Sequence, residues 1–420
     1  MATHDNQKSR RAGTVADKER ECILCGRCLE VCPLFIATHQ EELSPRGKAF
    51  LLDKALEQGE LGDPATARQL LGLCLGCEQC AQVCPQGRNL PRTLRRLKAE
   101  QPGWQSWVWR VWISQARWIW PHLGLGTCLL PQRLAPGSAF AGLKSLADRP
   151  RMSAVIRGLP RAARLQGPTV LFPGCVARWA KPWWTQTAQT LLGSADEVVL
   201  DWSCCGFTLG QAGLTGPRLD ACRTNIALWR LLGRPAVATI CATCDAALRG
   251  YADEPGLFVD EAESRLWSQA VRPLSALLDP GDFVRIDESR VLYHRPCHAQ
   301  RFDRGHDPDE MLLRGILGSG FCTSAKGACC GLGGVLRLSA PELSARVGKW
   351  YWENVPDPEI RRVVTGCSGC VLQLAASAPD NVVVTHWLDL LGPAEGCVWF
   401  GERVWDSPGL CAGVSSRAKK

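Results

Sequence analysis

Short apolar runs alternate with longer segments of helical period in the part of the chain beyond residue 168. The runs are rich in β-branched residues, which is typical of strands. They are TVLFP at 169–173, EVVL at 197–200, AVATI at 236–240, RVLY at 290–293, RVVT at 362–365 and NVVVT at 381–385. Because strands separated by helical segments pair in parallel, this part of the chain is expected to form α/β units.

The residues before this part follow a different pattern. Apolar positions at helical spacing run from Phe50 to Leu61, between two cysteine-rich segments. We predict an α+β multi-domain protein with a helical domain, a Trp-rich connector and a duplicated α/β part. The predicted boundaries are 1–100 for the helical domain, 101–167 for the connector, and 168–285 and 286–415 for the two repeats.

The connector begins with WQSWVWRVWISQARWIW at 104–120, which holds six of the seventeen Trp. Wound as one helix, this segment places its polar residues in a narrow stripe: Ser106, Arg110, Ser114 and Arg117. Such a helix is too short and too charged to span a bilayer. Two interpretations stay open. The wide apolar surface favours a helix buried between the cluster domains or against a partner. The Trp and the basic residues upstream (Arg88, Arg92, Arg95, Arg96 and Lys98) would also suit an anionic membrane surface.

Two tight cysteine runs, CILCGRCLEVCP and CLGCEQCAQVCP, mark the helical domain with the spacing CxxCxxCxxxCP. Three thiolates of such a loop bind one iron-sulfur cube, and the cysteine before proline binds the other cube. The runs therefore predict two 4Fe-4S clusters with crossed ligand sets. The sets are Cys22, Cys25, Cys28 and Cys84 for one cluster, and Cys74, Cys77, Cys80 and Cys32 for the other. Zinc also accepts four thiolates, but two runs ending in CP favour iron-sulfur clusters.

Ten further cysteines form two sets of five. They are Cys175, Cys204, Cys205, Cys241 and Cys244, then Cys297, Cys329, Cys330, Cys367 and Cys370. Three pairs of equivalent cysteines lie 122, 125 and 126 residues apart, and this near-constant offset indicates an internal repeat. The cysteines follow predicted strands, and parallel sheets place ligands at the carboxyl ends of their strands. Each set is therefore expected to converge on one centre.

The doublets WSCCGF and GACCGL indicate an unusual multi-iron centre, because adjacent cysteines cannot easily serve one cubane corner each. Gly206 and Gly331 would let the backbone approach the sulfurs closely. Buried core thiols, zinc, or a catalytic dithiol in one copy remain alternatives. The cysteines outside these patterns are expected to be spectators: Cys128, Cys222, Cys322, Cys397 and Cys411.

Histidines are weaker candidates. His294 and His298 flank Cys297, and a ring nitrogen could donate a hydrogen bond to a cluster sulfide and raise the cluster's potential. A purely structural hydrogen bond is the more common role for such a residue. His386, near the end of the chain, belongs to no motif.

Composition and missing motifs narrow the class of protein. The N-terminal twenty residues are polar, and no apolar region follows the pair Arg10 and Arg11, so we expect a cytoplasmic chain whose clustered cysteines bind metal. A formal charge of +8 is too mild to indicate nucleic acid. No GxGxxG follows a strand and no P-loop occurs, so no flavin or nicotinamide is expected on this chain. The GLGG run at 331–334 lies in a cysteine loop.

Taken together, these motifs resemble the glycolate oxidase iron-sulfur subunit family, whose members carry cysteine-rich (CCG) domains. The resemblance covers nearly the whole chain, including SPRGKAFLLDKALEQGE between the two runs, FPGC, YHRPCHAQ and the closing THWLDLL. The corresponding iron-sulfur subunit of anaerobic glycerol-3-phosphate dehydrogenase and the heterodisulfide reductases are similar as well. The resemblance implies two 4Fe-4S clusters, and one or two further iron-sulfur centres in the repeats.

The resemblance also implies a role. Such a subunit passes electrons from an FAD-linked 2-hydroxy-acid dehydrogenase partner, of glycolate or lactate type, toward a quinone or another carrier, at most peripherally attached to the inner face of the cell membrane. One departure favours an alternative. Both copies keep a complete CxxC, CATC and CSGC, as in heterodisulfide reductases, where five cysteines hold a non-cubane cluster. The alternative is therefore a thiol-disulfide oxidoreductase.

Overall fold

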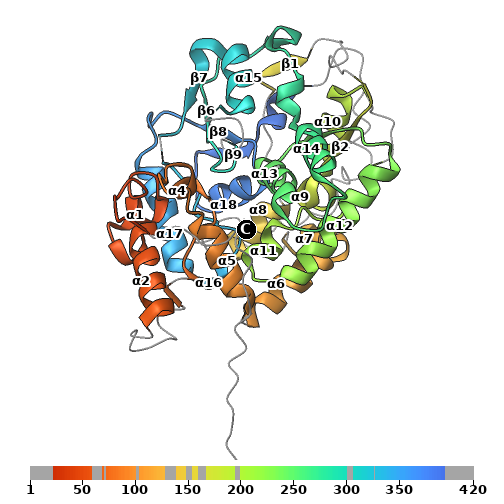
Figure 1. Ribbon diagram of the computed structural model, residues 1–420. Helices are drawn as coiled ribbons and strands as arrows, with labels where there is room; N and C mark the ends of the chain where they lie inside the picture. Colours follow the sequence, from red (N-terminus) through yellow and green to blue (C-terminus); the bar gives the residue numbers. More distant parts are fainter. Residues whose placement is uncertain are drawn as a thin grey trace, which may run out of the picture.

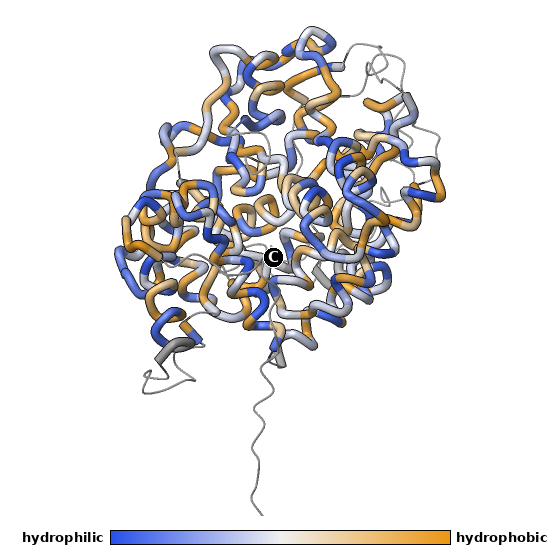
Figure 2. Tube along the Cα trace, in the orientation of Figure 1, coloured by the Kyte–Doolittle hydropathy of each residue, from blue (hydrophilic) through white to orange (hydrophobic). Residues whose placement is uncertain are grey.

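The computed structural model describes residues 22–58, 69–70, 72–100, 104–127, 139–147, 154–158, 167–193, 199–299, 306–325 and 327–392 (Figure 1). It shows the α+β class, with helices in the N-terminal part and parallel sheets in the repeats. Hydrophobic and hydrophilic residues alternate over short stretches along the coloured trace (Figure 2). Among the described residues, no helix is long and apolar enough to cross a membrane.

Short helices joined by cysteine loops build the N-terminal domain. They are α1 Pro33–Thr38, the 3-10 helix η2 Glu41–Leu43, α2 Pro45–Gln58, α4 Gln79–Gln82 and α5 Leu90–Glu100. Proline occupies the first position of α1 and of α2, where no backbone N–H is needed. The helix predicted from Phe50 is confirmed as part of α2 up to Gln58, and its last three residues lie outside the described part.

The connector forms α6 Trp104–Ser114, α7 Ala116–Thr127, α8 Ala139–Ala147 and β1 Ile156–Gly158. The prediction of one Trp-rich helix with a single polar stripe is wrong, because the chain turns at Gln115 and, of the four stripe residues, Arg110, Ser114 and Arg117 are exposed whereas Ser106 is buried. Ser106 is buried and donates a hydrogen bond to the Ala212 carbonyl at 2.6 Å. Trp120 belongs to the main core and packs on Trp112, with ring centroids 5.6 Å apart.

Two parallel sheets contain the duplicated strands. One has the order β2-β3-β4, with β2 Thr169–Phe172, β3 Ala236–Thr239 and β4 Val271–Pro273. The other has the order β7-β6-β8-β9, with β6 Val291–Tyr293, β7 Phe321–Thr323, β8 Arg362–Thr365 and β9 Val383–His386. Strands β6, β8 and β9 thus repeat the order of β2, β3 and β4.

Five of the six predicted strands are confirmed. In the sixth, at 197–200, the described residues Val199 and Leu200 are not in a strand, because the chain turns there into the doublet loop. Trp202 N–H donates to the Leu200 carbonyl at 2.9 Å.

Helices connect and cover these strands (Figure 1). In the first repeat they are α9 Gly174–Trp179, α10 Pro182–Leu191, α11 Phe207–Gln211, α12 Thr215–Leu231, α13 Ala242–Arg249, η3 Gly250–Asp253, α14 Glu261–Ala270, η4 Leu274–Leu277 and η5 Pro280–Asp282. In the second they are α15 Pro308–Leu317, η6 Gly318–Gly320, α16 Leu336–Ser339, α17 Pro341–Glu353, α18 Ser368–Ala375 and η7 Trp387–Leu390. A third sheet, β10-β1-β5, pairs β1 with β5 Phe283–Arg285 and β10 Leu391–Gly392, so the connector joins the ends of both repeats.

A carboxylate joins the two repeats on the side of α10. Asp389 of η7 accepts hydrogen bonds from the indole N–H groups of Trp183, at 3.0 Å, and Trp184, at 2.8 Å, and from the Thr385 hydroxyl. Trp184 is almost fully buried, and its ring lies 4.8 Å from that of His386. One side chain of the closing THWLDLL motif therefore fixes two aromatic residues of the other repeat.

Replacing this carboxylate should destabilise the protein. We expect Asp389→Ala to cost about 2–4 kcal/mol, because two indole donors lose their acceptor in a buried place. The measurement is the denaturant midpoint of the anaerobically purified protein. The matched control is Asp380→Ala, an exposed acid nearby, which should change stability by less than about 0.5 kcal/mol. Equal midpoints for the two variants would contradict the role given to Asp389.

Candidate iron-sulfur centres

Each tight cysteine run folds into a loop with two left-handed backbone positions. In the first run these are Leu24 (φ 55°) and Gly26 (φ 80°); in the second, Gly76 (φ 68°) and Glu78 (φ 57°). The positions are equivalent, two and four residues after the first cysteine. A residue with positive φ reverses the local curl of the chain, so successive sulfurs can face one point.

The Glu78 conformation is secured by an ion pair. Its nearly buried carboxylate accepts from Arg95 Nη1 at 2.8 Å and from Asn89 Nδ2 at 3.3 Å. Such a partner offsets the steric cost of a left-handed non-glycine residue.

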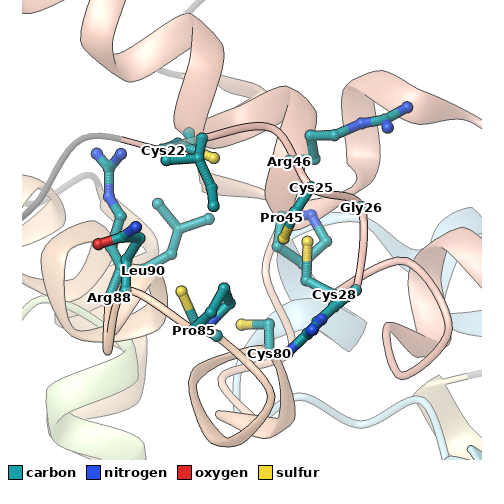
Figure 3. Close-up of a pocket in the computed structure, with 15 residues that line it drawn as sticks. Cys22, Cys25, Gly26, Cys28, Pro45, Arg46, Cys80, Pro85, Arg88 and Leu90 are labelled. Atoms are coloured by element: carbon teal, nitrogen blue, oxygen red, sulfur yellow. The ribbon is translucent and has the colours of Figure 1, made fainter.

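The first predicted ligand set surrounds one pocket. All four of its cysteines line this cavity: Cys22, Cys25, Cys28 and Cys84. In Figure 3 the sulfurs of Cys25, Cys28 and Cys80 turn toward the same space. Four thiols around a shared cavity are the donor set that a cubane iron-sulfur cluster requires, so the residues present fit this group.

The second predicted set lines a neighbouring pocket: Cys32, Cys74, Cys77 and Cys80. Cys32 thus lines a pocket with the second run and Cys84 lines one with the first run, as the crossed ligand sets would require. Cys80 lines both cavities, which makes the two sites direct neighbours. Burial raises the pKa of Cys77 and of Cys80 well above the ordinary value. A metal would have to displace these protons to bind.

Two lysines near the second set, Lys48 buried and Lys98 half-buried, were not assigned a role at the clusters from the sequence. Lys48 lines the cavity and donates to the backbone carbonyls of Leu43 and Leu73, the latter at 2.5 Å. Burial lowers the pKa of Lys48, while the nearby Cys74 thiol acts in the opposite direction. Burial also lowers the pKa of Lys98, which Cys74 likewise opposes. A cation at this place would offset the negative charge of a thiolate-bound cluster.

The five cysteines of the first repeat converge as expected. The Cys204 sulfur hydrogen-bonds the thiols of Cys175 and Cys205, Cys205 contacts Cys244, and Cys244 contacts Cys241. Gly206 (φ 78°) directs its N–H at the Cys204 sulfur, 3.4 Å away. The doublet glycine therefore does let the backbone approach a sulfur.

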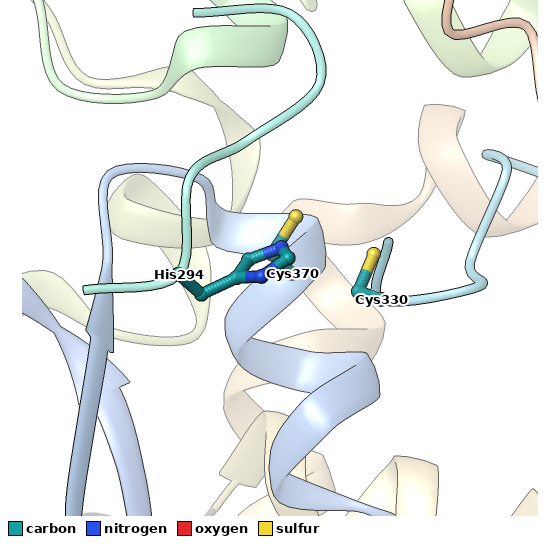
Figure 4. A group of neighbouring side chains, drawn as sticks. All are labelled: His294, Cys330 and Cys370. Carbon is teal, nitrogen blue, oxygen red and sulfur yellow. The ribbon is translucent and has the colours of Figure 1, made fainter. Parts of the chain in front are cut away.

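The second repeat brings its doublet and its CxxC together in the same way. Cys330 hydrogen-bonds Cys329 and Cys370, and Cys370 contacts Cys367. Gly331 (φ 85°) points its N–H at the Cys329 sulfur, 3.4 Å away. In this repeat a histidine joins the sulfurs. A ring nitrogen of His294 lies within 4.8 Å of the sulfurs of Cys330 and Cys370, and the two sulfurs lie within 4.8 Å of each other (Figure 4).

The two sets of five meet where the CxxC segments begin helices α13 and α18. Cys241 and Cys367 cap these helices with nearly identical backbone angles, and their thiols hydrogen-bond each other. Ala242 N–H donates to the Gly366 carbonyl at 2.8 Å, and the Thr243 hydroxyl lies 3.2 Å from the Cys367 sulfur. The carboxyl ends of β3 and β8 therefore face each other across the repeat interface.

The second ferredoxin-type loop lies against this interface. His298 contacts the Gly76 carbonyl through Nε2, at 3.3 Å, and the Thr243 hydroxyl through Nδ1, at 3.1 Å. A side chain at Gly76 would collide with Gln211, with a Cβ only 2.3 Å from its Nε2. Burial raises the pKa of Cys77, and the Cys297 thiol adds to this upward shift. His298 thus joins three segments, and its Nδ1 also lies 3.9 Å from the Cys297 sulfur.

His386 and the described cysteines outside the repeated patterns have structural roles away from these centres. His386 Nδ1 accepts from Leu388 N–H at 3.2 Å and Nε2 contacts the Ile240 carbonyl at 2.7 Å, so it caps η7. Cys222 is a core thiol, and Cys322 donates to the Val291 carbonyl at 3.4 Å. Cys128, Cys397 and Cys411 lie outside the described residues.

Comparison with known proteins agrees with this geometry. A family model described as a 4Fe-4S dicluster domain matches residues 19–88, and one described as a cysteine-rich domain matches 169–249 and again 291–375. Together these matches span more than half of the chain.

Similar proteins align over most of the length. A probable glycolate oxidase iron-sulfur subunit of Bacillus subtilis is 27% identical over 89% of this chain and 94% of its own. The glycolate oxidase iron-sulfur subunit of Escherichia coli is 24% identical over 93% and 98%. A dihydromethanophenazine:CoB--CoM heterodisulfide reductase component of Methanosarcina acetivorans is 23% identical over 83% and 86%. The chain therefore belongs to the iron-sulfur proteins that join a 4Fe-4S dicluster domain to two cysteine-rich domains.

Proposed function

We propose that this chain is the electron-transfer subunit of a flavin-linked 2-hydroxy-acid dehydrogenase of glycolate or lactate type. The observation that carries the proposal is an unbroken succession of four cysteine sets through one protein. Clusters bound there would accept and release single electrons, which is the chemistry needed to oxidise a two-electron-reduced flavin in one-electron steps. Cys22, Cys25, Cys28 and Cys84, and Cys32, Cys74, Cys77 and Cys80, would hold two 4Fe-4S clusters; the ten repeat cysteines would hold one or two further centres.

The contacts give this relay an order. The two ferredoxin-type sets share the wall at Cys80. The second of them touches the second repeat, because Cys32 and Cys329 share one apolar cluster and His298 contacts the Gly76 carbonyl. The second repeat touches the first through Cys367 and Cys241. The second repeat would therefore be the intermediate station between the ferredoxin-type clusters and the first repeat, whichever direction the electrons take.

The relatives named as glycolate oxidase iron-sulfur subunits support membership of a multi-subunit oxidoreductase complex. In our proposal, a separate FAD-linked partner oxidises the substrate. A quinone is the acceptor we propose. Exposed Trp107 and Trp118, at 67% and 58%, lie near exposed Arg110 and Arg117. Aromatic and basic side chains together suit the surface of an anionic membrane.

A specific observation favours a second candidate function, that of a thiol-disulfide oxidoreductase. Both repeats carry a complete CxxC, and Cys241 of one meets Cys367 of the other, as a site acting on a disulfide would require. A similar protein is named as part of a heterodisulfide reductase.

Paired substitutions test the crossed ligand sets. Cys84→Ser should remove or alter the cluster of the Cys22 set, so adding Cys25→Ser to it should change the electron paramagnetic resonance spectrum little further. Adding Cys77→Ser instead should affect both ferredoxin-type clusters, because Cys77 belongs to the other set. The reverse pattern, with Cys77→Ser silent in the Cys84→Ser background, would show that each run binds its own cluster.

The relay itself is tested by reduction with a natural donor. The anaerobically isolated chain should have its clusters reduced by a flavoprotein dehydrogenase together with glycolate or lactate, and by neither alone. Absorbance bleaching and electron paramagnetic resonance follow the reduction. The matched control is the same mixture with a sugar alcohol as donor. Bleaching by the substrate without the flavoprotein would contradict the assigned role.

The second function predicts turnover by the chain alone. If the repeats cleave disulfides, the reduced protein with an artificial one-electron donor should consume a mixed thiol disulfide, and thiol release would follow donor oxidation. Under the relay proposal, no thiol is released while the clusters still reduce a quinone. Catalytic thiol release would favour the disulfide reductase function over the relay.

A further inference from the structure

The two repeats differ at one position that faces their sulfurs. Phe172 lies three residues before Cys175, and His294 lies three residues before Cys297, each at the carboxyl end of the first strand of its repeat. Both side chains are 1% exposed. Phe172 shares an apolar cluster with Cys205 and Cys244 and packs on Trp202. A hydrogen-bonding ring in one copy thus replaces an aromatic hydrocarbon in the other.

His294 is held so that its ring meets the sulfurs. Its backbone N–H donates to the Val364 carbonyl at 2.8 Å, and its ring packs edge-on against Tyr351, with centroids 5.0 Å apart. A ring nitrogen lies within 4.8 Å of the sulfurs of Cys330 and Cys370 (Figure 4). Among the described residues, Nδ1 of His294 has no hydrogen-bond partner.

The tyrosines beside the two sets repeat this contrast. In the first repeat, Tyr251 donates to the Cys205 carbonyl at 3.1 Å and accepts from Asn225 Nδ2 at 3.1 Å. In the second, the buried hydroxyl of Tyr351 has no partner among the described residues. A buried hydroxyl is therefore left without a partner in the second repeat, while the hydroxyl of Tyr251 in the first repeat is satisfied within the protein.

A donor at this place acts on the electron affinity of a centre. Reduction adds negative charge to the cluster and its thiolates, so an N–H group pointing at a ligand sulfur stabilises the reduced form and raises the potential. The effect is larger where water is excluded.

We propose that His294 donates a hydrogen bond to the Cys330 thiolate and makes the centre of the second repeat easier to reduce than that of the first. This inference rests on the proposed function, since it requires a cluster in each repeat. Because the second repeat lies between the ferredoxin-type sets and the first repeat, the middle of the relay is then its electron sink. His294 is a positioning residue in this account, and it need not bind iron.

Three variants of the full chain test the proposal by redox titration followed with electron paramagnetic resonance and Mössbauer spectroscopy. His294→Phe copies the first repeat and should lower the potential of one repeat centre, making its reduction about tenfold less favourable, which is about 59 mV for one electron. His294→Gln keeps an N–H donor and should retain part of the potential. Phe172→His is the converse change and should raise the potential of the other repeat centre.

The outcomes separate this inference from the proposed function. Iron and sulfide content of the wild-type protein is measured first; a protein with no more iron than two 4Fe-4S clusters and one further centre hold would overturn this inference, whereas the proposed function fails only if the flavoprotein and its substrate leave the clusters oxidised. If all centres are present but His294→Phe leaves every potential unchanged, only the role of His294 fails. Strong nitrogen hyperfine coupling in the wild-type protein, lost in His294→Phe, would instead make His294 an iron ligand and overturn the hydrogen-bond assignment.

Discussion

The contact between the two CxxC segments positions all the cysteine sets in this molecule. Cys241 and Cys367 begin helices α13 and α18 with the same backbone geometry, and Ala242 N–H donates to the Gly366 carbonyl between them. Both helices direct their N-terminal partial charge at the sulfurs, which favours thiolates at this interface. Because β3 and β8 both end here, the repeats must face each other, and ten sulfurs fall within one region.

The N-terminal domain is held against that interface by groups that carry no metal ligand. His298 links Gly76, Thr243 and its own repeat, and Gln211 occupies the space that a side chain at Gly76 would need. Cys32, Leu75 and Cys329 share one apolar cluster, so the second ferredoxin-type set is buried together with part of the second repeat. Dense packing of this kind fixes the separation of neighbouring centres, on which single-electron transfer depends.

Regular local signals were predictable from the sequence. The crossed assignment of Cys32 and Cys84 follows from the CxxCxxCxxxCP spacing, and the duplication follows from the constant offset between equivalent cysteines. Strands β2, β3, β6, β8 and β9 follow from β-branched apolar runs. Strands β4 and β7 were missed, because VRP and FCT are too short to show a period and form only where a neighbouring strand offers an open edge.

Other features depend on contacts between residues distant in the sequence. Lys48 would be read as a surface residue of an amphipathic helix, and only the fold brings the Leu73 carbonyl to its ammonium group. Likewise, Gly76 and His298 are 222 residues apart along the chain. The Trp-rich segment was predicted as one helix because periodicity alone does not reveal a break: a turn at Gln115 separates α6 from α7, although both helices contribute side chains to the same core cluster.

The central claim is that the second ferredoxin-type centre and the centre of the second repeat are direct neighbours in one relay. Electron spin relaxation of the reduced protein tests it most directly, because a paramagnetic neighbour shortens the relaxation time of a cluster. We predict fast relaxation of one ferredoxin-type signal in the wild-type protein, and slower relaxation of that signal in Cys330→Ser, where the repeat centre is disrupted. Identical relaxation in the two proteins, with the repeat centre present only in the wild type, would contradict the claim.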